Sequence, residues 1–318
     1  MKAMHPKVSW GTLCDLFGIS RQAYYQQLNR EIKTAFEAEI VLKEVKELRK
    51  DQRRVGTRKL YIHLQGVLRQ HGIKMGRDAL FDLLREHGLL VRRRKRRIKT
   101  TDSNHPWRKY PNLIKSFEPN GANQLWVSDI TYLHTDEGFV YLFLITDAYS
   151  HKVVGYHTSF NMEATSALAA LRMALNQLEE GQTPFHHSDR GSQYCSDIYT
   201  ALLKKNSLPI SMTENGDPWE NAVAERINGI LKNDLLPEKI STKSEAVDLV
   251  HYFVKVYNSI RLHSSVENLT PDEAHKRTGV LCRLWKKERS EKSESVPVDA
   301  NLSSPESVSK GQALRVSS

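Results

Sequence analysis

Three acidic residues in the middle of the chain have neighbours and spacing that suggest shared chemistry. Asp129 lies in "WVSDITY", among residues typical of a strand, and Asp189 lies in "HHSDRGSQY", where polar residues follow a predicted strand. Glu225 lies in the helical stretch "ENAVAERINGILKND". A carboxylate inside a strand costs free energy unless it is exposed at a sheet edge or bound to something. Each acid alone could be a cap, a turn residue or part of a solvated helix face, but together they predict a cation site.

Three converging carboxylates would repel one another and raise one another's pKa values unless a cation lay between them. Mg²⁺ suits such a site, because it prefers oxygen ligands in octahedral geometry and usually shares them with substrate phosphates. Two ions about 4 Å apart can stabilise both the attacking and the leaving oxygen of an in-line phosphoryl displacement. We therefore expect two Mg²⁺ ions per site, with Mn²⁺ as a substitute.

The helix that contains Glu225 is amphipathic. At about 100° per residue, its polar face collects Asn221, Glu225, Asn228 and Lys232. Such a face is usually just solvated. If the acids bind metal, however, Lys232 lies two turns from Glu225 and could touch DNA beside the ions.

The surrounding segments predict a mixed sheet that would hold these acids. Residues 124–135 and 139–149 read as strands joined by the turn "DEG", and residues 152–159 read as a third strand. Helices are expected near 162–180 and 198–205, with strands at 183–189 and 208–213, and a later helix over 244–263. Three antiparallel strands followed by alternating helices and strands imply an α/β fold with helices on both faces. Ligands commonly bind at the carboxyl ends of strands in such sheets.

The first 32 residues contain a predicted helix-turn-helix. In "TLCDLFGISRQAYYQQL", Gly18 can supply the turn and Ser20 can cap the second helix. Its first turn would present Arg21, Gln22 and Tyr25 to DNA. A generic helical hairpin explains the motif equally well.

A second helical unit follows, with a charged helix over about 35–53. Another helix is expected from about Thr57, a break at Gly72, a helix from about Gly76 to His87 and a stop at Gly88. Two such units favour DNA binding, and contact with another protein is the alternative.

Charge is distributed unevenly along the chain. Residues 1–118 hold 27 lysines and arginines against 12 acids, and residues 119–318 hold 20 against 25, within a net charge of +10. The densest basic run is "RRRKRRIK", residues 92–99. We expect six of its side chains to contact DNA phosphates: Arg92, Arg93, Arg94, Lys95, Arg96 and Arg97. A basic front half and a mildly acidic back half predict a polyanion-binding module attached to another function.

Composition points to a reducing compartment. The three cysteines, Cys14, Cys195 and Cys282, are far apart and form no CxxC pair. This argues against a disulfide framework and a structural zinc site. No apolar run approaches a membrane span and no signal-peptide core is present, so we expect a cytoplasmic protein, associated with the nucleoid and with no membrane partner.

The segment from Asn123 to Lys232 resembles the DDE recombinase core shared by retroviral integrases and many transposases, an RNase H-like fold. The 35 residues between Asp189 and Glu225, and the lysine seven residues after Glu225, are features of that family. More narrowly, "WVSDITY", "HSDRGSQY", "SMTENGDPWENAVAERINGILKND" and "YNSIRLHSSVENLTPDEA" resemble the second-frame product of a bacterial insertion-sequence family. The sequence departs at "ENA", where many relatives have "DNA", and at Asp234, where Glu is common.

The resemblance implies roles for individual residues. Asp129, Asp189 and Glu225 would be the catalytic metal ligands, and Asn221 and Lys232 would lie near DNA. Further residues would surround the site without an assigned role: His187, Ser188, Arg190, Gly191, Gln193 and Tyr194; of these we expect Arg190 to contact DNA. A second motif is expected to pack against the core: Tyr257, Asn258, Arg261 and His263. His186 and His187 are expected to be structural or to contact phosphate, because a two-metal site needs no general base.

The resemblance also implies a domain organisation. The expected division is helix-turn-helix at 1–32, a second helix-turn-helix-like domain at 33–91, a basic linker at 92–120, the RNase H-like catalytic core with a helical extension at 121–284, and a disordered tail at 285–318. The core would contain a mixed five-stranded sheet.

The implied activity is that of a DNA transposase. Water would cut one strand at the terminal inverted repeats, and the freed 3′-hydroxyl would then attack another phosphodiester in target DNA, without a covalent enzyme intermediate. A homo-oligomer on DNA and an upstream-frame DNA-binding protein are the implied partners. One alternative is a DNA-binding regulator whose core is inactive without a frameshift fusion partner, and another is a nuclease that acts on RNA–DNA hybrids.

Overall fold

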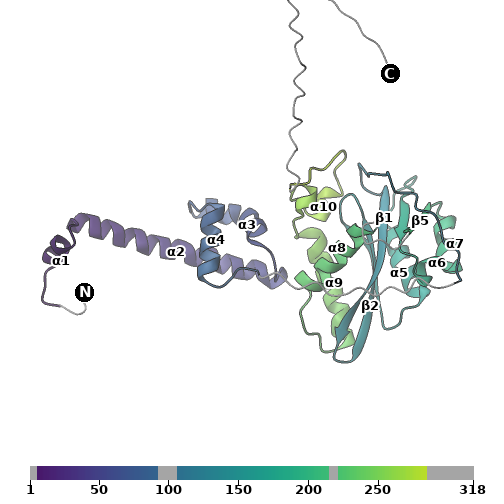
Figure 1. The fold of residues 1–318 in the computed structure, drawn as a ribbon, viewed down its shortest axis with the longest axis horizontal. Helices are drawn as coiled ribbons and strands as arrows, with labels where there is room; N and C mark the ends of the chain where they lie inside the picture. The colour runs from purple at the N-terminus through teal and green to yellow at the C-terminus, as the bar shows by residue number, and fades with distance from the viewer. Residues whose placement is uncertain (1–5, 92–105, 215–220, 285–318) are drawn as a thin grey trace, which may run out of the picture. The chain divides into compact units, whose positions relative to one another are not determined.

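The computed structural model describes residues 6–91, 106–214 and 221–284 (Figure 1). The basic run at 92–97, Glu220 and the predicted tail at 285–318 lie outside the described residues. No helix within the described part of the chain is long and apolar enough to cross a membrane.

The N-terminal part is helical. Its helices are α1 (Trp10–Leu16), α2 (Arg21–Asp51), α3 (Thr57–Gln70) and α4 (Arg77–Glu86). The predicted turn and cap are confirmed, because Gly18 has φ +65° and the Ser20 hydroxyl accepts a hydrogen bond from the Ala23 amide. Gly72 also takes a positive φ between α3 and α4, as its predicted role in the break requires.

One prediction for this part is wrong. The sequence suggests a short recognition helix and then a separate charged helix over about 35–53, but α2 is a single helix of 31 residues. The boundary placed between residues 32 and 33 therefore falls inside a helix. No glycine or proline interrupts residues 21–51, so nothing in the local chemistry ends the helix there.

The C-terminal half of α2 packs with α3 and α4 around a shared core. Val41 and Val45 from α2 meet Leu60 and Leu64 from α3, and α4 adds Leu80. The N-terminal half of α2 instead exposes apolar side chains four residues apart, with Leu28, Ile32 and Phe36 being 36%, 61% and 64% exposed.

The strands lie within residues 106–214 and form one mixed sheet with the order β3-β2-β1-β4-β5. They are β1 (Leu125–Thr135), β2 (Gly138–Asp147), β3 (Val153–Ser159), β4 (Phe185–Ser188) and β5 (Ile210–Met212). The first three pair antiparallel, and β4 runs parallel to both β1 and β5. This confirms the five-stranded RNase H-like α/β fold expected from the sequence.

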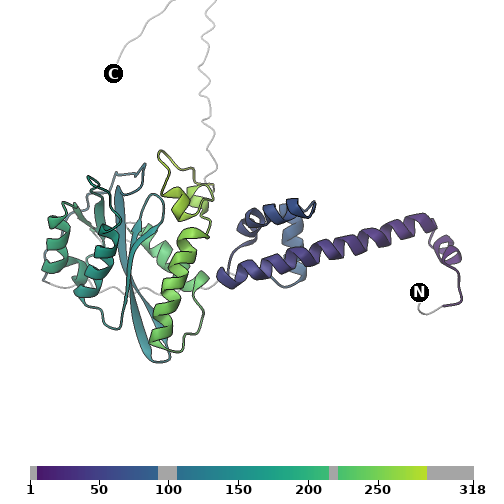
Figure 2. The same ribbon diagram turned by 180° about the vertical axis from the view of Figure 1, so that it is seen from behind.

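Helices cover both faces of the sheet (Figures 1 and 2). One face carries α5 (Ala164–Leu175), α6 (Ser192–Cys195) and α7 (Asp197–Lys205). The other carries α8 (Ala222–Ile230), a π-helical turn η1 (Leu231–Leu235) and α9 (Lys243–Ser259). The chain continues through the 3₁₀ turn η2 (Ser264–Val266) and α10 (Pro271–Ala274).

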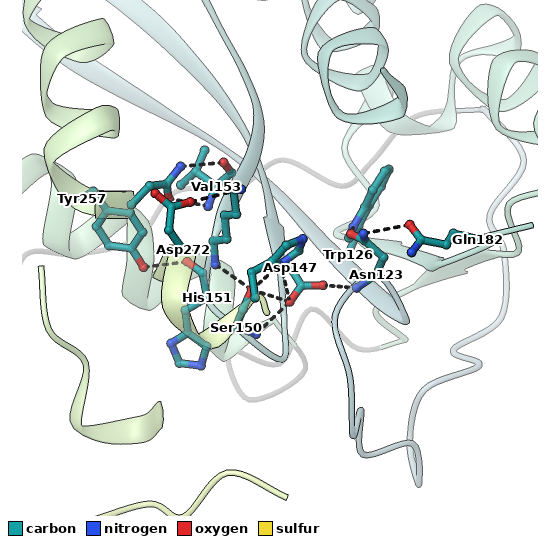
Figure 3. Close-up of polar contacts among 12 residues, drawn as sticks. Asn123, Trp126, Asp147, Ser150, His151, Val153, Gln182, Tyr257 and Asp272 are labelled. Carbon is teal, nitrogen blue, oxygen red and sulfur yellow. Dashed lines mark hydrogen bonds and ion pairs between the residues drawn. The ribbon is translucent and has the colours of Figure 1, made fainter. Parts of the chain in front are cut away.

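A buried carboxylate fixes the turn between β2 and β3 (Figure 3). Asp147 is fully buried. It accepts hydrogen bonds from the backbone amide of Asn123 at 2.8 Å and from the backbone amide and the hydroxyl of Ser150 at 2.7 and 2.6 Å. The Ser150 hydroxyl also lies 2.9 Å from Nδ1 of His275, just after α10. These hydrogen bonds offset the cost of burying the carboxylate. They also connect the segment before β1 and the residue after α10 to the turn between β2 and β3.

The motif near residue 260 has the packing role predicted for it. Asn258 pairs with both the backbone amide and the carbonyl of Val153, at 3.0 and 2.9 Å. The Tyr257 hydroxyl donates to the His151 carbonyl at 2.9 Å (Figure 3). Arg261 donates to Asp234 at 2.8 Å. These bonds attach α9 to the edge strand β3 and to η1.

The contact between β3 and α5 gives a test of the fold. A Cβ added at Gly155 would lie 2.3 Å from the Ala170 carbonyl oxygen, whereas one added at Gly229 in α8 would meet nothing closer than 3.9 Å. We expect Gly155→Ala to lower the free energy of unfolding by about 1–3 kcal/mol through overpacking. Gly229→Ala should raise it by up to about 1 kcal/mol, because alanine favours the helix. Urea unfolding followed by circular dichroism measures both, and equal stability of the two variants would contradict this packing.

Candidate active site

The register between β1 and β4 brings two of the predicted acids together. These strands are parallel, and Ser128 pairs with Ser188. Asp129 is the next residue of β1 and Asp189 is the first residue after β4, so the register brings the two aspartates next to each other where β4 ends. Neighbouring parallel strands are about 4.8 Å apart, which places both carboxylates within the reach of one cation.

Asp129 is held in a half-buried position. Its Oδ2 accepts a hydrogen bond from Nδ2 of Asn228 at 2.7 Å, and its Oδ1 accepts one from the Ile130 amide at 2.9 Å. Burial is the main cause that raises the pKa of Asp129 to about 7. The charge of Asp189 and, to a smaller extent, that of Glu225 act in the same direction, and the hydrogen bonds from Asn228 and Ile130 oppose them. Without a cation, the site therefore resists carrying its full negative charge.

Asp189 is oriented by the backbone that follows it. Its Oδ1 accepts a hydrogen bond from the Gly191 amide at 3.0 Å. A Cβ at residue 191 would lie 3.0 Å from that same oxygen, so the lack of a side chain at Gly191 allows the close approach. The tight turn into α6 thus sets the direction of this carboxylate.

Glu225 lies in the first turn of α8, which packs on β1. Its charge acts on Asp129, so the third acid belongs to the same electrostatic neighbourhood. However, among residues 6–91, 106–214 and 221–284, no group of three His, Cys, Asp or Glu side chains is close enough to form a metal cluster. Within the described residues, Asp129 and Asp189 are neighbours and Glu225 is near them, but the three carboxylates are not close enough together to form one ligand cluster.

The polar face of α8 turns toward the sheet. Asn221 and Asn228 are each only 6% exposed, and Nδ2 of Asn221 donates to the Ser128 carbonyl at 3.0 Å. The face is therefore not simply solvated, as the metal-site reading of the helix requires. The side-chain amide of Asn221 fastens the start of α8 to β1 immediately before Asp129, and its predicted proximity to DNA stays a prediction.

Asn228 is the functional residue that sequence reasoning missed. The sequence places it on the polar face with Glu225 without indicating a role, yet it makes the only side-chain hydrogen bond to Asp129 found among the described residues. Its position three residues after Glu225, on the same helix face, was the available signal.

The predicted DNA-contacting residues are dispersed. Lys232 lies in η1, where its ammonium sits 4.0 Å from the ring centroid of Tyr132 on β1. Arg190 directly follows Asp189 and is partly exposed, whereas Arg21, Gln22 and Tyr25 are exposed at the start of α2. The structure thus describes Arg190 next to Asp189, Lys232 against Tyr132, and the other three residues in the helical part of the chain.

The two adjacent histidines are structural. His186 is fully buried, and its Nε2 lies 2.8 Å from both the Ser128 and the Tyr199 hydroxyl groups. Burial lowers the pKa of His186 to about 3. His187 is also fully buried and pairs with the Ser211 hydroxyl at 2.9 Å. Neither imidazole reaches solvent, so neither can contact a phosphate or act as a general base on bulk water.

The chain is similar in sequence to integrase core domains and to proteins of bacterial insertion sequences. Residues 119–218 and 206–271 each match a family model described as an integrase core domain. A 31 kDa protein of insertion element IS600 from Shigella sonnei is 35% identical over 264 residues, covering 81% of this chain and 96% of that protein. The transposase of insertion sequence element IS629 from Shigella sonnei is 34% identical over 274 residues, covering 84% and 91%. The HTLV-2 integrase catalytic core domain, solved in complex with magnesium, has a TM-score of 0.39 at 16% identity, covering 50% and 99%.

The raised pKa of Asp129 predicts a pH-dependent cost to stability. Because its folded pKa of about 7 exceeds the ordinary 3.8, folding is favoured at acidic pH and loses stability as pH rises from about 4 through 7. We expect Asp129→Asn to be more stable than wild type at pH 8 without divalent ions, by on the order of 1–3 kcal/mol given partial exposure. The difference should vanish near pH 4.

Melting temperature in EDTA as a function of pH measures this effect. Asp248→Asn, at an exposed position on α9, is the matched control and should follow wild type at every pH. An Asp129→Asn protein less stable than wild type at pH 8 would contradict the electrostatic account.

Proposed function

This chain belongs to the insertion-sequence transposases that contain an integrase core domain, and from that premise we propose that it cuts and joins DNA strands at the terminal inverted repeats of its element. The relatives favour this activity over that of a DNA-binding regulator with an inactive core. The RNA–DNA hybrid nuclease receives no support from the family.

The observation that carries the proposal is the aspartate pair at the end of β4. Asp129 and Asp189 offer only oxygen donors. Burial and the neighbouring acids raise the pKa of Asp129 to about 7, so a positive charge placed there would stabilise its ionised form. These residues fit a divalent cation, and we propose that Glu225 completes the ligand set. Mg²⁺, as two ions with Mn²⁺ as a substitute, would supply Lewis-acid stabilisation of the phosphate oxygens.

The chain's own contribution is positioning. The Asn228 amide fixes one oxygen of Asp129, and the Gly191 amide fixes one oxygen of Asp189, so both carboxylates are oriented before substrate arrives. Asn221 holds α8 against β1 and thereby sets where Glu225 stands. Catalysis in this scheme comes from holding the attacking hydroxyl and the phosphodiester in line, and no side chain needs to form a bond to DNA.

We propose double-stranded DNA and a second copy of the chain as partners. Arg190, which follows Asp189, and Lys232, in the helical segment after Glu225, are suited to phosphates, and Arg21, Gln22 and Tyr25 at the start of α2 are suited to end recognition. The exposed ridge of Leu28, Ile32 and Phe36 supports pairing of copies, because residues four apart pack ridge into groove at about −50°. Joining requires both DNA ends of the element in one complex, and a dimer of the chain would bring them together.

A plasmid assay tests the function directly. A supercoiled plasmid carrying both ends of the element is incubated with Mg²⁺ and with wild type, Glu225→Gln or the control Glu180→Gln, an exposed acid after α5. We expect nicked or joined end products from wild type and Glu180→Gln, and a loss of at least about 100-fold in Glu225→Gln, because a metal ligand is neutralised. Products that survive Glu225→Gln would contradict the ligand assignment, and end binding without product from wild type would favour the regulator.

Asn228 gives a prediction specific to this structure. Asn228→Ala removes the amide that holds Asp129, so we expect a 10- to 100-fold loss of activity, as is usual when a partner that orients a metal ligand is removed. Because the role is positioning, raising the Mg²⁺ concentration should restore part of the activity, whereas it should restore none in Asp129→Asn. Unchanged activity in Asn228→Ala would show that this hydrogen bond does not orient the site.

A further inference from the structure

Two large apolar side chains are exposed on the loop between β3 and α5. Phe160 is 58% exposed and Met162 is 49% exposed. The loop follows the last residue of β3, and β3 runs in the same direction as β1 because both pair antiparallel with β2. The loop therefore lies at the end of the sheet toward which β1 runs from Asp129. We call residues 160–163 the rim loop.

Hydrogen bonds among polar side chains shape the rim loop. The Ser159 hydroxyl donates to Oδ1 of Asn161 at 2.8 Å, and Nδ2 of Asn161 donates to Oε1 of Glu163 at 2.8 Å. The Thr165 hydroxyl, in the first turn of α5, donates to Oε2 of Glu163 at 3.3 Å. The loop is thus attached to β3 and to α5, so its two apolar side chains extend from a preorganised backbone. Preorganisation lowers the entropic cost of binding a partner.

The rim loop is also attached to the turn that orients Asp189. Nε2 of Gln193 donates to the Met162 carbonyl at 2.9 Å. Oε1 of the same amide lies 3.3 Å from the place that a Cβ at residue 191 would take, and that place is 3.0 Å from Oδ1 of Asp189. These contacts put the Met162 carbonyl within roughly 12 Å of the Asp189 carboxylate, a little more than three base-pair steps of about 3.4 Å.

A positive charge lies beside the first of the two apolar side chains. The Lys243 ammonium, at the start of α9, is 5.5 Å from the centroid of the Phe160 ring. An apolar side chain next to a cation suits duplex DNA, which has stacked bases inside and phosphates outside. Proteins that bend DNA commonly insert phenylalanine, leucine or methionine between two base pairs, which unstacks that step and kinks the duplex.

We propose that Phe160 and Met162 insert into target DNA at a base step near the joining site and kink it, while Lys243 contacts a neighbouring phosphate. The inference rests on the proposed function and adds to it a binding site for the target duplex. Inserted apolar side chains form no hydrogen bonds with base edges, so they read little sequence directly. They favour flexible pyrimidine–purine steps instead, because those steps cost less to kink. Such weak selectivity suits a target, whereas the fixed ends of the element require direct recognition.

A branched DNA that mimics the joined product tests the kink. One element end is already joined to a target duplex, whose two arms carry a donor dye and an acceptor dye. The full chain is titrated with Ca²⁺ in place of Mg²⁺, so that bending is measured apart from Mg²⁺-dependent chemistry. One double variant combines Phe160→Ala with Met162→Ala, and the other combines Phe160→Leu with Met162→Leu. Met173→Ala is the matched control, because Met173 is a methionine on α5 that is 39% exposed.

We expect wild type, Met173→Ala and the leucine double variant to raise energy transfer between the two arms alike. The alanine double variant should leave the arms straight, because no side chain is inserted to offset the unstacking of the step. With Mg²⁺ it should join ends into target DNA about 10- to 100-fold more slowly. Cleavage at the element's own ends should change less than about threefold, since that reaction needs no target. Melting temperature checks that all variants are folded.

A mismatched target gives a second readout, which a merely structural role of the loop would not move. A mismatched base pair at the joining site costs less to unstack than a paired one. The alanine double variant should therefore join into the mismatched target about 5- to 20-fold faster than into the paired target. Wild type should gain less than about threefold, because its side chains already stabilise the kink.

Three results would overturn the inference. In the first, the alanine double variant bends the arms and joins like wild type. In the second, it loses cleavage and joining equally on both targets, which would make the rim loop a support for the turn at Asp189. In the third, it still bends DNA but has a lower molar mass by light scattering, which would make the loop a contact between copies.

Failure of the proposed function is distinguishable from failure of this inference. A wild type that bends the branched DNA through these side chains but gives no product with Mg²⁺ would refute the function and support the kink. A wild type that cleaves and joins while the alanine double variant does the same refutes only the kink. A wild type that neither binds the branched DNA nor gives product refutes both.

Discussion

The parallel pairing of β1 with β4 is the constraint on which the rest of the site depends. It places Asp129 and Asp189 side by side at the position where β4 ends, and half-burial there makes two negative charges costly. The other features of the site follow from that cost. Asn228 and the Gly191 amide support one carboxylate each, and α8 brings a third acid to the same place.

Sequence alone predicted the sheet and the acids because both depend on local patterns. Alternation and β-branched residues mark the strands, whereas the link between Asp189 and Glu225 comes from the resemblance to the DDE recombinases, in which 35 residues separate these two acids. The continuity of α2 was missed because an N-cap at Ser20 signals where a helix begins, and no residue in that region signals where it ends. The placement of Glu225 and the aspartates as metal ligands stays a prediction.

The orientation of α8 could not be obtained from periodicity. Both of its faces are buried, one by apolar residues such as Ile227 and the other by Asn221 and Asn228, which bond to β1. A helical wheel separates polar from apolar residues, but it does not predict that the polar face will pack against β1 and donate hydrogen bonds to it.

We propose that Asp129 and Asp189, brought together by strand register, bind a divalent cation. Anomalous diffraction from crystals of the chain soaked in Mn²⁺ tests this proposal, because the signal locates the ion without reference to activity. We expect a peak within about 2.0–2.3 Å of a carboxylate oxygen from each of the two aspartates, and loss of that peak in Asp189→Asn. A well-ordered site with no Mn²⁺ peak between these two side chains, or with ions bound only elsewhere, would contradict it.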